Sequence, residues 1–213
     1  MVFSSLTFLY LFLPLSLLFH YSTKNDLFRN IFLTIFSLVF YAWAEPMWIF
    51  LMVFTALFDY STGLYIEKKR GTPWAKVGLI ASIVVNIGLL VAYKYGGFIY
   101  DNLNYLFPLP FDRPQNSLPV GISFYTFMVI SYVVDIYRGE IKAQRNPLNF
   151  LMFISLFQHL VAGPIVRYSQ ISEQVEKRTI DWSRMSDGVT RFCIGLFKKV
   201  AIANVAGVLV DKY

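Results

Sequence analysis

Long apolar stretches, separated by short polar turns, run along almost the whole chain and predict a series of membrane helices. A helix needs about 20 residues to cross the hydrocarbon layer of a membrane. We therefore expect an all-α, polytopic membrane helix bundle that forms a single transmembrane domain over residues 1–213. The predicted spans are Phe3–His20, Arg29–Trp43, Met47–Ile66, Ala75–Tyr95 and Leu118–Tyr137, followed by apolar stretches at Leu148–Val166 and from about Val200 onward.

The positive charges are concentrated in alternate turns between the predicted spans. The turns around Lys24, Lys69 and Lys142 carry several cations, whereas the turn Ala44–Pro46 carries none. Cytoplasmic loops of membrane proteins hold an excess of Lys and Arg. The pattern predicts a multi-pass protein with its amino terminus outside and these three turns in the cytoplasm.

The composition agrees with a membrane protein and argues against several other classes. Hydrophobic residues make up 56% of the chain and charged residues 15%, where soluble domains carry about a quarter charged residues. The net charge of +6 is typical of cytoplasmic loops that face membrane lipids, so no nucleic-acid partner is expected. With one cysteine and two histidines, no metal site is expected, and no nucleotide-binding motif occurs.

The sixth apolar stretch contains features that an ordinary membrane helix avoids. Its end, Phe157–Arg167, is F-Q-H-L-V-A-G-P-I-V-R, so an amide, a histidine and a Gly-Pro pair lie in apolar surroundings. A broken helix inside a membrane requires protein or water around its free backbone groups. Two paths are open: a full crossing would place Arg167–Arg191 outside, whereas re-entry broken at Gly163-Pro164 would keep that segment in the cytoplasm. We favour re-entry, beside an aqueous funnel.

His159 is the first candidate for a functional side chain in this stretch. An ionisable group at membrane depth indicates function, as a base, a proton relay or a hydrogen-bond donor, but the ring could equally bond to a neighbouring carbonyl for structure alone. Gln158 is a candidate lining residue beside it. Arg167 could bind a phosphate or carboxylate through its planar guanidinium group, or it could be an anchor at the membrane surface.

Two earlier spans also carry polar candidates. Ser131 and Asp135 are four residues apart in the fifth span and share a helix face, so both are candidates for binding substrate or lining a tunnel. Asp135 could instead pair with Arg138 and close the end of the helix. Asp59 lies inside the third span, where a carboxylate needs a partner such as a Ser or Thr hydroxyl; it could also line the funnel.

Gly188–Lys199 has the pattern of an amphipathic helix. Its apolar side chains recur at helical spacing, while Arg191, Lys198 and Lys199 lie off that stripe. Such a helix is expected to lie in the cytoplasmic interface of the membrane. The two lysines would contact anionic lipid or an acidic carrier protein.

An ordered set of motifs resembles the membrane-bound O-acyltransferase family, in its alginate O-acetylation branch. Each motif is weak alone, but their order and spacing along the chain are specific. Gln158 departs from the pattern, because a proline is expected before the histidine. The motifs are M-V-F-S-S at Met1–Ser5, F-Y-A-W at Phe40–Trp43, Y-K-Y at Tyr93–Tyr95, L-P-V-G-I-S-F-Y-T-F at Leu118–Phe127, S-Y-V-V-D-I-Y-R-G at Ser131–Gly139, H-L-V-A-G-P-I-V-R at His159–Arg167 and G-V-T-R-F with G-L-F-K-K-V-A-I-A within Gly188–Ala203.

The resemblance implies an enzyme of the bacterial inner membrane that transfers an acyl group, usually acetyl, from a cytoplasmic donor to hydroxyls of an extracytoplasmic polysaccharide such as alginate. It implies a ring of helices around a thin floor pierced by a tunnel. The donor, acetyl-CoA or an acyl carrier, would be a substrate, with no bound cofactor, and periplasmic acetylation proteins would be partners. The main catalytic histidine of the family is expected beyond Tyr213, which leaves His159 a supporting role and the 213-residue chain alone inactive.

Two other functions are compatible with a broken membrane segment. A transporter or channel would also place broken helices and polar groups at the middle of the membrane, but it should show repeats and a second broken helix. A non-catalytic membrane scaffold would recruit partners without chemistry of its own. A histidine in a later apolar helix would favour the enzyme.

Overall fold

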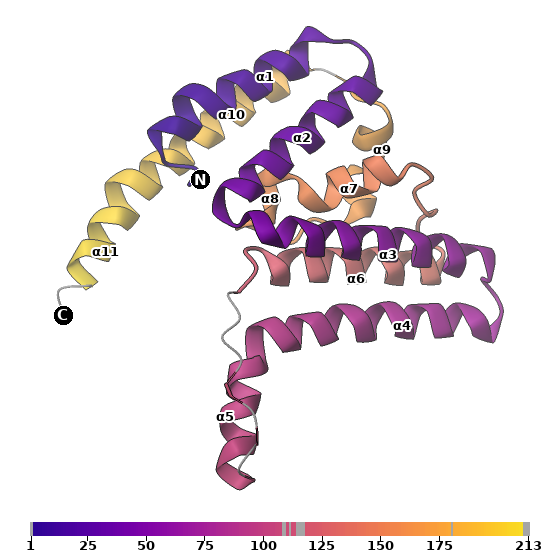
Figure 1. Ribbon diagram of the computed structural model, residues 1–213. Helices are drawn as coiled ribbons and strands as arrows, with labels where there is room; N and C mark the ends of the chain where they lie inside the picture. Colours follow the sequence, from indigo (N-terminus) through magenta and orange to yellow (C-terminus); the bar gives the residue numbers. More distant parts are fainter. Residues whose placement is uncertain (1, 108–109, 111, 114–117, 180, 211–213) are drawn as a thin grey trace.

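The computed structural model describes residues 2–107, 110, 112–113, 118–179 and 181–210, and these residues form helices and turns without a strand (Figure 1). The predicted all-α class is confirmed. Residues 1, 108–109, 111, 114–117, 180 and 211–213 lie outside the described residues, among them the first residue of the M-V-F-S-S motif and the end of the last predicted apolar stretch. The helices are η1 (Phe8–Phe12), α1 (Leu13–Ser22), α2 (Asp26–Ala44), η2 (Pro46–Trp48), α3 (Ile49–Lys68), α4 (Pro73–Leu90), η3 (Val91–Tyr95), α5 (Gly96–Leu106), α6 (Ile122–Arg138), α7 (Pro147–Ser155), α8 (Phe157–Leu160), α9 (Tyr168–Glu176), α10 (Trp182–Phe197), η4 (Lys198–Ala203) and α11 (Asn204–Val210).

Four helices of the described chain are long and apolar enough to cross a membrane. Three of them contain the predicted second, third and fourth spans. The predicted first and fifth spans correspond to shorter helices, Phe8–Ser22 and the 17-residue α6. The four are Asp26–Ala44, Pro46–Lys68, Pro73–Leu106 and Trp182–Val210.

Local sequence signals explain where the helices of the central bundle begin and end. The side chain of Asn25 accepts a hydrogen bond from the Leu27 N–H and so caps α2. Asn146 caps α7 in the same way, and Pro147 follows at the first helical position, where a missing N–H costs little. Gly139 ends α6 with a φ of 84°, a conformation that favours glycine.

The buried core lies where α3, α4, α6 and α7 pack together. Tyr132 of α6 is at its centre, with its ring centroid 4.5 Å from that of Phe150 on α7. A second cluster joins η1 to α2 and α8 through the rings of Phe8, Phe12, Phe40 and Phe157. In Figure 1, α3, α6 and α4 run side by side, and α1, α2 and α10 cross that layer obliquely.

The buried carboxylate of Asp59 is satisfied inside this core, as the sequence predicted. The Ser82 hydroxyl donates to its Oδ1 and the Asn86 amide donates to its Oδ2 at 2.8 Å. All three side chains are fully buried or nearly so. Since α3 and α4 are linked by these two hydrogen bonds, the polar cluster holds the hairpin together without exposing a charge to lipid.

The predicted helix at Gly188–Lys199 is present, but it is part of a longer helix. That segment is the middle of one continuous helix, Trp182–Val210, which runs alongside α1 (Figure 1). Apolar residues continue past Lys199 with no proline to end the helix, so the backbone hydrogen bonds continue through the lysines. The apolar stripe lies partly toward α1, because Phe192 and Leu196 line a cavity between the two helices.

Candidate functional site

The sixth apolar stretch enters the bundle and returns to the same end of it. The Asn30 amide, near the start of α2, donates to Asn149 Oδ1 at 2.8 Å and to the Val175 carbonyl at 2.9 Å. Asn149 lies at the start of α7 and Val175 near the end of α9. Because one side chain contacts both ends of the segment, the chain from α7 to α9 re-enters rather than crosses. We refer to Pro147–Glu176 as the re-entrant segment.

The deepest part of this segment lies beside the start of α6. A Cβ atom built on Gly121, immediately before α6, would lie 2.6 Å from the Leu160 carbonyl oxygen. Phe150, nearer the start of the segment, instead packs on Tyr132, ten residues into α6. The segment therefore follows α6 over most of its length before turning back.

The backbone of the segment is broken at two places. Leu156, with φ −54° and ψ 113°, separates α7 from α8, and Gly163 has a φ of 112°. The predicted irregular backbone at Gly163-Pro164 is present. An additional break, which the sequence analysis did not predict, separates α7 from the short helix α8 at Leu156. The first break has a polar partner inside the bundle, since the Phe157 N–H donates to the Ser37 hydroxyl at 3.3 Å.

His159 stabilises this break. Its Nε2 lies 2.9 Å from the Phe153 carbonyl oxygen, one of the last carbonyls of α7. A carbonyl can only accept, so the ring hydrogen is on Nε2, and Nδ1 remains an acceptor when the ring is neutral. The half-buried histidine thus makes the structural contact that was the alternative to a catalytic role, because it satisfies a carbonyl that the helix leaves without a partner.

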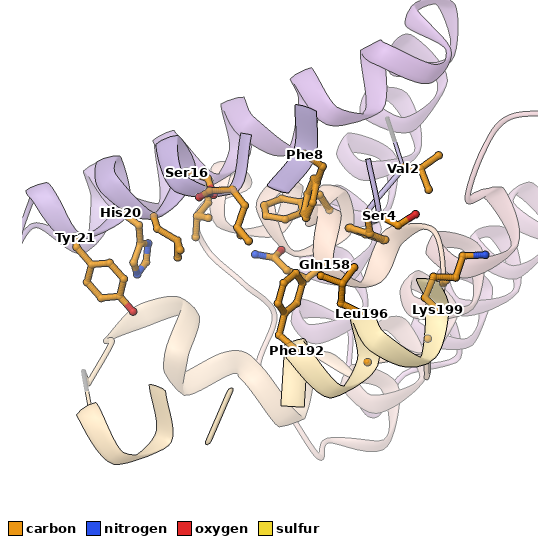
Figure 2. Close-up of a pocket in the computed structure, with 18 residues that line it drawn as sticks. Val2, Ser4, Phe8, Ser16, His20, Tyr21, Gln158, Phe192, Leu196 and Lys199 are labelled. Atoms are coloured by element: carbon orange, nitrogen blue, oxygen red, sulfur yellow. Dashed lines mark hydrogen bonds between the residues drawn. The ribbon is translucent and has the colours of Figure 1, made fainter. Parts of the chain in front are cut away.

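A cavity of about 960 Å³ lies between the re-entrant segment, α1 and α10. Gln158 brings an amide to its wall, and Figure 2 shows this side chain between α1 and α10. His20 lies toward one end of the cavity and Lys199 toward the other (Figure 2). The remaining wall is mainly apolar: Val2, Phe3, Ser4, Phe8, Leu13, Ser16, Leu17, Tyr21, Leu33, Phe157, Ala162, Gly163, Phe192, Gly195 and Leu196.

The other predicted site residues do not line this cavity. The Ser131 hydroxyl donates to the Met128 carbonyl of its own helix at 2.7 Å. Asp135 is buried, with 3% of its surface exposed, and Glu140, Arg167 and Arg138 are the charged side chains that act on its carboxylate. Neither Asp135 nor Arg167 lines the cavity.

Among the described residues Asp135 and Arg138 form no ion pair, although the charge of Arg138 does act on the Asp135 carboxylate. Arg138 is exposed at the end of α6 and pairs with Glu140, at 3.8 Å, after the chain turns at Gly139. Asp135 faces the core instead, where its Oδ2 atom accepts no hydrogen bond from the described residues. Asp135 and Arg138 are only three residues apart in the helix. The turn at Gly139, however, brings the Glu140 carboxylate next to Arg138, and these two side chains form the ion pair.

Sequence reasoning missed His20, and it gave Lys199 a role at the membrane surface rather than a place at the end of this cavity. His20 lies in α1 and Lys199 in η4, and both come to the cavity because the continuous helix from Trp182 lies across it from α1. The signal available for His20 was its place as an ionisable residue at the end of an apolar helix. Within the described residues, no three His, Cys, Asp or Glu side chains gather to hold a metal ion.

The geometry is suited to binding and positioning rather than to a complete set of catalytic groups. The cavity offers an amide, an imidazole and an ammonium group at the edges of a mainly apolar space. Acyl transfer to a hydroxyl also needs a base beside that hydroxyl and donors for the developing oxyanion. The described residues supply hydrogen-bonding groups but do not assemble both functions at one point of the cavity.

Comparison with known proteins gives consistent relatives over almost the whole chain. A Pseudomonas aeruginosa protein named "Probable alginate O-acetylase AlgI" is 40% identical over 216 residues, which cover 99% of this chain and 41% of that protein. Its namesake from Pseudomonas putida is 39% identical over 99% of the chain. The "Peptidoglycan O-acetyltransferase" of Helicobacter pylori is 29% identical over 96% of the chain.

The chain spans less than half the length of these relatives, between 41% and 45% of each. No family model matches it, and no solved structure does. The identity nevertheless extends from end to end of the chain and agrees with the ordered motifs and the all-α membrane fold. This chain belongs to the membrane-bound O-acyltransferase family, among the relatives of the alginate O-acetylases.

Proposed function

We propose that the chain is part of a membrane enzyme that transfers an acetyl group to hydroxyls of an extracytoplasmic polysaccharide such as alginate. The observation that carries the proposal is the 37–40% identity, over 99% of the chain, to five proteins named for alginate O-acetylation. The peptidoglycan enzyme among the relatives supports the same reaction class on a different polymer. Alginate is favoured because more relatives, and more similar ones, carry that name.

The re-entrant segment supports this function by its position. At its first break the Phe157 N–H is satisfied by the Ser37 hydroxyl of α2, and its Gln158 and Gly163 lie on the wall of the 960 Å³ cavity. An activated acyl group that crosses a membrane needs a path protected from lipid and limited in water. In our proposal the cavity is part of that path, Gln158 hydrogen-bonds the moving acyl group, and His159 keeps the segment in shape.

The direction of transfer follows from the charge pattern. With the turns near Lys24, Lys69 and Lys142 in the cytoplasm of a bacterial inner membrane, both ends of the re-entrant segment would also face the cytoplasm. Acetyl-CoA or an acyl carrier would deliver the acetyl group there as a substrate, and periplasmic partner proteins would take part on the other side. The main catalytic histidine is assigned, by family resemblance, to residues beyond Tyr213, so the 213-residue chain alone should be inactive.

A labelled-acetyl transfer assay in membranes tests this function with the full-length protein. Gln158→Ala should lower transfer to polysaccharide about tenfold or more, since one hydrogen bond to a reacting group is worth roughly a factor of ten. Ser131→Ala is the control, because that hydroxyl bonds within its own helix and lies off the cavity wall. Failure of the wild-type protein to transfer acetyl to any polysaccharide would refute the proposal.

A further inference from the structure

Arg178, between α9 and α10, is a half-buried cation whose hydrogen-bond partners among the described residues are all neutral acceptors. Its Nε donates to the Gln174 carbonyl at 3.1 Å, its Nη1 to His20 Nδ1 at 3.3 Å and its Nη2 to Met152 Sδ at 3.4 Å. Every ion pair found among the described residues uses a different cation. A guanidinium group stays charged in proteins, so a positive charge in this partly buried position lacks a paired carboxylate.

The one carboxylate that acts on this cation among the described residues, Asp26, does so without forming an ion pair with it. Burial lowers the pKa of Arg178, the nearby Asp26 raises it, and the positive charge of Arg29 lowers it further. Asp26 is itself engaged by Arg29, with Nη1 and Oδ1 3.3 Å apart. The electrostatics of this position therefore favour an added anion, which would gain more here than in water because the group is partly desolvated.

His20 adds a second donor at the same place. Arg178 can only donate, so Nδ1 of His20 must accept its hydrogen bond and the ring hydrogen must be on Nε2. Arg184 also reaches the site, but its charge is met by Asp181 at 3.4 Å. These side chains surround a hollow of about 400 Å³, which is lined by His20, Tyr21, Gln174, Arg178, Thr179, Asp181, Arg184 and Met185.

We propose that this hollow binds a phosphate group, with Arg178 as its main ligand and the His20 Nε2–H as a second donor. A guanidinium group offers several N–H donors in one plane and matches phosphate oxygens well, and the hydroxyls of Tyr21 and Thr179 line the same hollow. The volume accommodates a phosphate together with the beginning of an ester substituent. The phosphate could belong to a phospholipid head group or to a soluble phosphate ester, and the experiment below separates these sources.

The site adjoins the large cavity without being part of the proposed acetyl path. His20 and Tyr21 line both spaces, whereas Arg178 and Arg184 line only the smaller one. A phosphate bound there would connect the end of α1 to the start of α10 and so fix one edge of the cavity. The proposal concerns binding alone and does not depend on the acetyl-transfer reaction.

Two series of thermal unfolding measurements on the full-length protein test the site. The first uses the protein in an uncharged detergent and adds inorganic phosphate at constant ionic strength. A second reconstitutes the protein in vesicles of phosphate-free digalactosyldiacylglycerol, with or without added phosphatidylglycerol. Stabilisation by both probes would indicate a site open to soluble phosphate esters, and stabilisation by phosphatidylglycerol alone would indicate a lipid head group. No stabilisation by either probe overturns the proposal.

Variants assign the effect to the residues named. Arg178→Gln should weaken the apparent affinity for the stabilising probe about tenfold or more, while Arg191→Gln, an exposed arginine off the hollow, should leave it unchanged. An unchanged response of Arg178→Gln would contradict the site. If Arg178→Gln does not fold, Arg178→Lys and His20→Gln decide: both should weaken binding, and wild-type affinity in both would refute the proposal.

Discussion

At the scale of single residues, buried polar side chains in this protein act mainly by satisfying one another. Asp59 is joined to Ser82 and Asn86 between two helices, and His159 satisfies a carbonyl at a helix break. In a membrane core no water is available to replace a lost partner. Removing one partner should therefore cost more than the hydrogen bond itself contributes.

The Asp59 cluster gives a quantitative prediction for the stability of the α3–α4 pair. Asp59→Ala should lower the free energy of unfolding by about 2–3 kcal/mol, because it leaves buried donors on Ser82 and Asn86. A double-mutant cycle with Asn86→Ala should give a coupling energy of about 1–3 kcal/mol. Unfolding in detergent measures both values, and strictly additive effects of the two changes would show that the contact has no energetic weight.

His159 provides a test that separates structure from chemistry. His159→Ala should lower the free energy of unfolding by about 1–3 kcal/mol, because the Phe153 carbonyl loses its donor. His159→Gln retains an N–H donor and should recover part of both stability and acetyl transfer. If both variants lose transfer while their unfolding temperatures equal that of the wild type, the imidazole itself takes part in the reaction.

Residue-scale prediction from the sequence succeeded where a side chain's nature limits its partners. A carboxylate inside a membrane helix needs donors, so hydroxyl partners for Asp59 could be expected from the sequence alone. The surroundings of Asp135 could not be predicted from the sequence, because they depend on the turn at Gly139 and on the charged residues that the folded chain brings near it. Likewise, Gln158 reaches the cavity and His159 does not, although they are neighbours.

At the scale of elements, the hydrophobic pattern predicted the membrane helices and the broken segment, but not every boundary. The second to fourth spans lie within helices of the structure, since their apolar stretches are long and end at polar turns. The pattern could not show that Trp182–Val210 is one helix, because the lysines at 198–199 resemble the end of an interfacial helix. It also left crossing and re-entry open, which the contacts of Asn30 decide.

Two glycines allow the geometry of the re-entrant segment to be tested. Gly121 and Gly163 both have positive φ, 75° and 112°, so an alanine at either costs about 1–2 kcal/mol in backbone conformation. At Gly121 the new Cβ would also lie 2.6 Å from the Leu160 carbonyl oxygen, whereas at Gly163 it would meet nothing within 4 Å. Gly121→Ala should therefore be the more destabilising in thermal unfolding, and equal effects would contradict the contact between α6 and the segment.

At the scale of the whole molecule, the bundle consists of crossing helices and one segment that turns back. Asn30 places the start of α7 and the end of α9 at one end of the bundle. From the charge pattern we predict that this end faces the cytoplasm and that the end of α5 lies on the other side. The arrangement makes the sidedness of each loop a direct test of the fold.

Cysteine labelling in intact cells measures that sidedness. In a Cys193→Ser background, single cysteines at Lys24→Cys, Lys142→Cys and Lys177→Cys should resist a membrane-impermeant maleimide and react only after permeabilisation. Tyr105→Cys, at the exposed end of α5, should react without permeabilisation. If Lys177→Cys reacts in intact cells while Lys24→Cys and Lys142→Cys do not, the sixth stretch crosses the membrane. If every position shows the opposite of the expected reactivity, the protein has the opposite orientation in the membrane.

The contacts of Asn30 also determine the order in which the protein can be assembled during synthesis. Asn30 is 119 positions from Asn149 and 145 from the Val175 carbonyl, so α2 leaves the ribosome long before either partner exists. Until the later residues emerge, the amide has neither bond. The cell's insertion machinery must therefore hold α2 in place before the segment from Pro147 to Glu176 arrives, and the helix that begins at Trp182 follows that segment.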